Sequence, residues 1–129
     1  MPATEKQISD LNDELTALAG TIETDSNSLA QTIAAIDEAN EEIETRKAQM
    51  MASIFSERFE INLKLKYTND EQRRVRLIEL QNGDVNFQTF LSVRSTLAGT
   101  SATQKAGIEK NRNLHRAKIL VLQYFANLP

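Results

Sequence analysis

Apolar residues recur every seven positions in the first part of the chain. The row consists of Ile8, Leu15, Ile22, Leu29, Ile36, Ile43 and Met50. A residue that repeats every seven positions returns to the same face of an α-helix after two turns. The row therefore predicts one long acidic helix over residues 4–66 that packs in a coiled coil. Thr4 and Gln7 have the spacing of a capping box at its start.

The second row that a coiled coil needs is much less apolar. It begins with Leu11 and Leu18 and continues with Asp25, Thr32, Ala39 and Arg46. A parallel two-stranded zipper requires both rows to be apolar. We therefore expect the long helix to pack antiparallel, with the C-terminal half of the chain as its partner.

Residues 59–67 have a different period, because apolar and polar residues alternate strictly from Phe59 to Tyr67. Such alternation is typical of a β-strand. The segment directly follows an uninterrupted helical pattern, however, and we expect the helix to continue through it. The alternative is a β-hairpin of residues 75–80 and 85–90 around the turn-forming Asn82-Gly83, to which residues 59–67 add a third strand. Long helices would then flank a small three-stranded β-meander at about 58–91.

The rest of the chain also favours helices. Thr68-Asn69-Asp70-Glu71 offers candidate caps and a capping box for a short helix over 70–81. Gly83 is expected to end it in the left-handed conformation, and Asp84 to cap a C-terminal arm over 84–127 that bends or breaks near Gly99. The predicted fold is all-α, a single elongated domain built as a long antiparallel helical hairpin or coiled coil.

Charge separates along the chain. Residues 1–45 hold eleven acidic residues and one lysine, whereas residues 95–127 hold five basic residues and one glutamate. Opposite charges at the two ends favour antiparallel contact between them. The acidic run within 37–44 lacks the glycine and alternating aspartates of a calcium loop. We interpret it as a solvated helix face that pairs with the basic arm.

Residues that carry chemistry are scarce. The chain has no cysteine, which excludes disulfides, thiolate zinc sites and thiol nucleophiles, and its single histidine, His115, has no companion ligand nearby. We expect no enzyme activity, no cofactor and no metal. The N-terminus lacks a signal-peptide pattern, and no apolar stretch reaches the roughly 18 residues of a membrane span. The expected location is the cytoplasm, or a virion assembled there.

Two groups are candidate interaction residues. The first is the heptad row together with an apolar cluster near the C-terminus that is too wide for one helix face: Ile119, Leu120, Val121, Leu122 and Phe125. We expect this group to form an interface with other subunits or a partner. The second group is basic and provides candidate phosphate contacts near the tip of the hairpin: Lys64, Lys66, Arg73, Arg74 and Arg76.

Two short stretches resemble a known family. They are Tyr67-Thr68-Asn69-Asp70-Glu71-Gln72-Arg73-Arg74 and Asp84-Val85-Asn86-Phe87-Gln88. They resemble small coiled-coil proteins of tailed phages and prophages, which carry Tyr-Ser/Thr-Asn-Asp/Glu-x-x-Arg-Arg between two long helices. This chain departs from that pattern at Asn82-Gly83. The resemblance implies a helical fold and a phage setting, and it supplies no site residues.

These observations lead to two functional expectations. The first is a non-enzymatic structural or assembly protein, a coiled-coil subunit that oligomerises with itself or docks onto other proteins of a larger complex such as a phage particle. The alternative is a nucleic-acid-binding accessory protein of a phage or mobile element that uses the basic tip.

Overall fold

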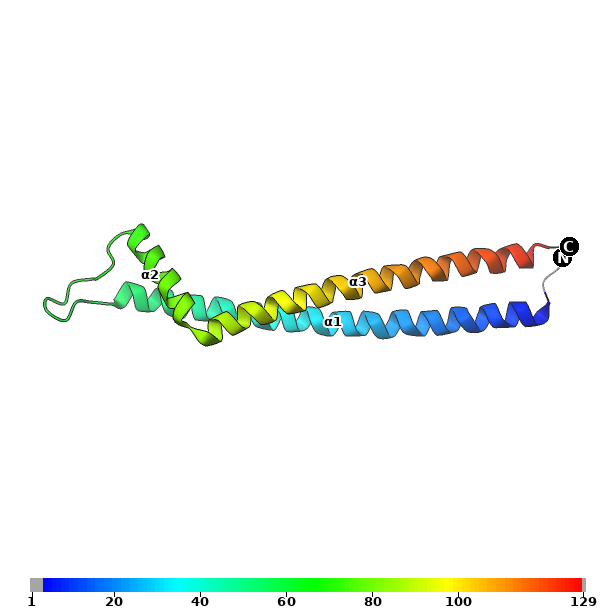
Figure 1. Cartoon of the computed structure of the whole chain (residues 1–129), viewed down its shortest axis with the longest axis horizontal. Coiled ribbons are helices and arrows are strands. Elements are labelled where there is room, and N and C mark those ends of the chain that lie inside the picture. The colour runs from blue at the N-terminus through cyan, green and yellow to red at the C-terminus, as the bar shows by residue number, and fades with distance from the viewer. Residues whose placement is uncertain (1–3, 129) are drawn as a thin grey trace. The chain divides into compact units, whose positions relative to one another are not determined.

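The computed structural model describes residues 4–128 and contains three α-helices (Figure 1). They are α1 (Glu5–Ser56), α2 (Asp70–Gly83) and α3 (Val85–Ala126). The predicted all-α helical hairpin is confirmed, because α1 and α3 pack against each other in opposite directions. The packing divides into two compact units. Unit 1 holds residues 4–33 and 99–128, and unit 2 holds residues 34–98.

The start of α1 follows the predicted capping box. The backbone N–H of Gln7 donates to Oγ1 of Thr4 over 3.2 Å, and the N–H of Thr4 donates to Oε1 of Gln7 over 2.8 Å. Both hydrogen bonds satisfy backbone donors that have no partner within the first turn of a helix.

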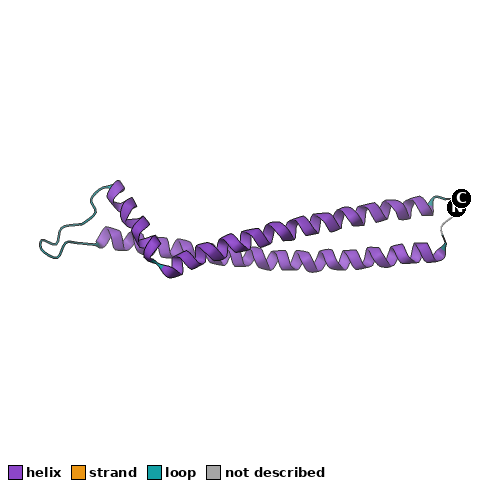
Figure 2. Ribbon diagram, viewed as in Figure 1, coloured by secondary structure: helices purple, strands orange, loops and turns teal. Residues whose placement is uncertain are grey.

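The end of α1 differs from the prediction. The helix stops at Ser56, so the expected continuation to residue 66 is wrong, and residues 57–69 form a loop (Figure 2). The β-meander is not formed either, since residues 4–128 contain only an isolated antiparallel bridge between Arg58 and Leu65. Two residues along a helix turn it by about 200°. Alternating apolar residues would therefore point to opposite sides of a helix, and no single packing face could hold them.

The helix caps around α2 follow the sequence only in part. Asn69 caps the helix, because its Oδ1 accepts a hydrogen bond of 2.9 Å from the N–H of Gln72. At the other end Gly83 does not adopt the expected left-handed conformation. Instead Asp84 alone leaves the helical region, with φ −94° and ψ 102°. Its Oδ1 then accepts from the N–H of Phe87 over 2.9 Å and caps α3 as predicted.

The expected bend near Gly99 is absent, and α3 runs through this position as a regular helix. One glycine in a helix costs only about 1 kcal/mol relative to alanine. That cost is small compared with the free energy that α3 gains by packing on α1 before and after Gly99 in the sequence.

The core of unit 2 draws on all three helices. Ile43 and Met50 of α1 and Phe87 of α3 are buried, and Leu77 and Leu80 of α2 pack against them together with Phe90 and Leu91. At the edge of this core the guanidinium of Arg46 lies 5.3 Å from the centre of the Phe90 ring. The same side chain is 3.6 Å from Oδ2 of Asp84. Asp84 therefore caps α3 and ties the α2–α3 connection to α1.

Phe87→Ala is expected to lower the free energy of unfolding by about 3–5 kcal/mol, because it leaves a cavity in the unit 2 core. Phe87 is 2% exposed, whereas Val85, two residues earlier in α3, is 77% exposed. Val85→Ala is the matched control and should change stability by no more than about 0.5 kcal/mol. Urea denaturation followed by circular dichroism measures both, and equal effects would contradict the described core.

Asp84→Ala should destabilise the protein by about 1 kcal/mol or more, since the α3 cap and the contact with Arg46 are both lost. Asp84→Asn retains a good capping side chain and removes only the charge. The expected order of unfolding free energies is therefore wild type, then Asp84→Asn, then Asp84→Ala. A variant with asparagine that is as unstable as the alanine variant would show that the cap is not what matters.

Candidate functional site

One ion pair shows the register of the two helices in unit 1. Nζ of Lys118 lies 2.6 Å from Oε2 of Glu14. In this part of the chain α3 has two heptad rows of its own, all buried or half-buried: Ser101, Ile108, His115 and Leu122, and Gln104, Asn111, Lys118 and Phe125. Both rows therefore face α1. The sequence analysis missed these rows because five of the eight residues are polar, and a heptad row is recognised by its apolar residues.

From this register and the heptad repeat, helix geometry places one residue of α1 opposite one residue of α3 in each layer. Nearest the chain termini both members are apolar, with Ile8 opposite Phe125 and Leu11 opposite Leu122. The next six layers each contain a polar residue: Leu15 with Lys118, Leu18 with His115, Ile22 with Asn111, Asp25 with Ile108, Leu29 with Gln104, and Thr32 with Ser101. In this series only Thr32, Ser101 and Ile108 are buried, and the other residues are half-buried. Polar layers of this kind weaken a helix pair but fix its register.

The heptad row of α1 is buried unequally in the two units. In unit 2, Ile43 is 0% exposed and Met50 is also buried, because α2 covers them. In unit 1 the corresponding residues Ile8, Leu15 and Ile22 stay half-buried. The unit 1 part of the predicted interface therefore remains accessible, whereas Ile43 and Met50 are occupied by the chain's own core.

The apolar cluster near the C-terminus is divided between two sides of α3. Ile119, Leu122 and Phe125 are half-buried on the side of α1. Leu120 and Val121 are exposed, as are two residues that were not in the predicted set, Leu114 and Tyr124. The prediction that this cluster is too wide for one helix face agrees with this division.

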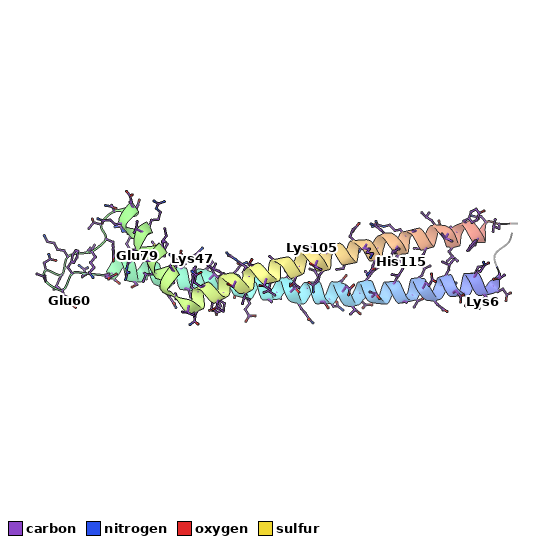
Figure 3. The ribbon with its side chains drawn as sticks, in the orientation of Figure 1. Lys6, Lys47, Glu60, Glu79, Lys105 and His115 are labelled. Atoms are coloured by element: carbon purple, nitrogen blue, oxygen red, sulfur yellow. The ribbon has the colours of Figure 1, made fainter. Side chains whose placement is uncertain are left out.

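A second apolar surface lies in the loop 57–69, which also contains Glu60 (Figure 3). Hydrogen bonds from the N–H of Phe59 to Lys64 O (2.9 Å) and from the N–H of Lys66 to Glu57 O (3.0 Å) close the loop. Four apolar side chains are exposed on it, and Ile61 reaches 99%: Phe59, Ile61, Leu63 and Leu65. Leu63 has a positive φ of 56°, an uncommon conformation for a residue with a branched side chain.

The five basic residues near this loop are not equally free. Lys66 lies 3.3 Å from Glu57, Arg73 lies 3.3 Å from Asp70, and Arg73 also lies over the ring of Phe55 at 4.5 Å. Arg76 contacts Glu79 at 3.2 Å and Glu57 at 3.6 Å. The hydrogen bond to Glu79 raises the pKa of the Arg76 guanidinium. Lys64 and Arg74 are exposed and form no ion pair within residues 4–128.

The remaining candidates offer little chemistry. The acidic residues of 37–44 are exposed, and among them Glu44 pairs with Lys47 one turn later in the same helix. Within the described residues, no three acidic or histidine side chains are grouped closely enough to hold a metal ion. His115 of α3 is half-buried (Figure 3). None of the helices described for residues 4–128 has the length and apolar content to cross a membrane.

The chain was compared with protein-family models, with curated proteins and with solved structures. None of the three comparisons found a match. The half-buried seam of unit 1 and the exposed apolar loop remain the two candidate interaction surfaces.

Proposed function

We propose that this chain is a non-enzymatic assembly subunit, which associates with further copies of itself and docks onto a larger complex. The observation that carries the proposal is the half-buried heptad row of unit 1, Ile8, Leu15, Ile22 and Leu29. Covering apolar side chains gains about 25 cal/mol per Å² removed from water. A partner helix on this seam would complete the burial that α2 provides for the same row in unit 2.

The apolar loop is the second surface that supports an assembly role. Phe59, Ile61 and Leu63 are exposed within five residues of one closed loop, and groups of exposed apolar side chains mark interaction sites more often than isolated ones do. The loop lies in unit 2, whereas the open seam lies in unit 1. One chain thus has separate surfaces for self-association and for docking, as an assembly subunit requires.

The phage setting of this proposal comes from the resemblance of 67–74 and 84–88 to coiled-coil proteins of tailed phages. Two residues of those stretches have structural roles in this chain. Asn69 caps α2, and Asp84 caps α3. A motif that positions a short helix between two long ones is consistent with a component of a particle that is built from helices.

The second candidate, a nucleic-acid accessory role, rests on Lys64 and Arg74, whose charges are exposed and unpaired within the described residues. It is the weaker proposal, because carboxylates partly neutralise Lys66, Arg73 and Arg76. It predicts that Lys64→Ala combined with Arg74→Ala weakens DNA binding at low salt more than Arg73→Ala does. Gel-shift titrations measure this, and a lack of binding at low salt would remove the candidate.

The assembly proposal predicts a mass above that of the 14.5 kDa chain in light scattering at micromolar concentration. Ile22→Ser removes a half-buried seam residue and should weaken self-association by roughly tenfold or more. Ile61→Ser makes the same change in the loop and should leave the mass unaffected. A wild-type chain that stays monomeric at all concentrations would contradict the proposal.

A further inference from the structure

One side of unit 1 presents an apolar stripe that does not face α1. We call it the outer stripe, and it consists of Leu114, Ala117, Val121 and Tyr124, all exposed. Their spacing of three, four and three residues is that of a coiled-coil contact face. Since α3 meets α1 through other rows, the outer stripe is a second seam on α3 that has no partner among residues 4–128.

The same side of unit 1 has small side chains on α1. Thr21 and Ser28 directly precede the seam residues Ile22 and Leu29, just as Leu114 and Val121 precede His115 and Leu122. In an antiparallel pair, residues that precede equivalent seam positions lie on the same side. Ala17 and Thr24 lie next to Thr21 on the same side of α1, further from α3. In the layers described above, this side of α1 holds Ala17 and Thr21 at the height of Leu114 and Ala117, and Asp10 and Glu14 at the height of Val121 and Tyr124.

The charges of the two arms indicate which helix covers the outer stripe. Residues 4–33 hold six acidic residues and one lysine, whereas residues 99–128 hold five basic residues and one glutamate. A second α3 on the stripe would bring basic arms together, while a second α1 would bring an acidic arm to a basic one. A two-fold axis parallel to the helices places α1 of each copy beside α3 of the other.

The polar layers give an independent reason for a second copy. Oε1 of Gln104 is buried and accepts no hydrogen bond within residues 4–128. Such an orphaned acceptor costs stability unless a donor reaches it. A two-fold axis parallel to the helices brings the side chain of Gln104 level with the same amide of the second copy, and an amide both donates and accepts.

We infer that two copies of this chain pack through this side of unit 1 into a four-helix bundle, in which Leu114 and Ala117 of each α3 lie against Ala17 and Thr21 of the other copy's α1, and Val121 and Tyr124 lie level with its Asp10 and Glu14. The inference rests on the proposed self-association and adds the face, the partner and the symmetry. Leu114 then meets small residues, acidic helices alternate with basic ones, and the half-buried seam becomes the centre of the bundle.

Cross-linking between single-cysteine variants tests this arrangement, because the natural chain contains no cysteine. Ala17→Cys and Ala117→Cys are made in separate chains, mixed, and treated with a short bis-maleimide. The expected product is a covalent dimer that contains one copy of each variant. Ala19→Cys lies on the opposite side of α1 and is the matched control. It should give on the order of tenfold less mixed dimer with Ala117→Cys, since helix geometry directs it away from the stripe.

Two outcomes would overturn the inference. One is a product dominated by Ala117→Cys joined to itself, and the other is equal cross-linking by Ala17→Cys and Ala19→Cys. If light scattering shows an oligomer while either outcome is found, the proposed self-association stands and only this arrangement falls. A monomeric chain would overturn both.

A second measurement does not depend on cross-linking. Leu114→Ser combined with Val121→Ser should weaken self-association by about tenfold or more, because the stripe loses both of its aliphatic branched side chains. The helical circular dichroism of this double variant should match that of the wild type at concentrations where both are monomeric, since neither residue faces α1. Unchanged association would contradict the inference.

Discussion

A pair of helices covers only one side of each helix, and this limit determines where the chain is closed and where it stays open. In unit 2 the limit is overcome by α2, whose Leu77 and Leu80 cover the α1–α3 seam from a third direction. Ile43 and Phe87 are then fully buried. Unit 1 has no third helix among the described residues, and the same heptad row stays half-buried there. The difference between the two units is thus one short helix.

The features that depend on local patterns could be read from the sequence. The seven-residue row of α1 predicted a long helix with an antiparallel partner, the Thr4–Gln7 spacing predicted its cap, and Asp84 was identified as the cap of α3. Each of these features depends on residues a few positions apart, or on a repeat that one helix face imposes. Such features can be recognised from one continuous segment of the sequence, without knowing what it packs against.

The features that depend on distant contacts were missed. Alternation over 59–67 was expected to yield to the preceding helix, but no face of α1 could bury both sides of it, and α1 ends at Ser56. Gly83 was expected to be left-handed, yet Asp84 makes the turn while its carboxylate contacts Arg46. The rows of α3 were overlooked because Gln104, Asn111 and Lys118 are polar, and only the position of α1 identifies them as seam residues. The separation of charge along the chain predicted an acidic residue of α1 paired with a basic residue of α3, as in Glu14–Lys118. In the Arg46–Asp84 pair the basic residue is instead on α1 and the acidic one precedes α3.

The sequence separation of the contacts in the two units has a consequence for how the chain folds. Arg94 and Asn40 in unit 2 are 54 residues apart, whereas Lys118 and Glu14 in unit 1 are 104 residues apart. The entropy lost on closing a loop grows with its length, and among the described residues only unit 2 has a well-buried apolar core to offset that loss. Unit 2 should therefore nucleate folding. Once unit 2 has formed, the two helical segments of unit 1 are already held together at one end. Their polar layers can then form one after another, and each closes only a short loop.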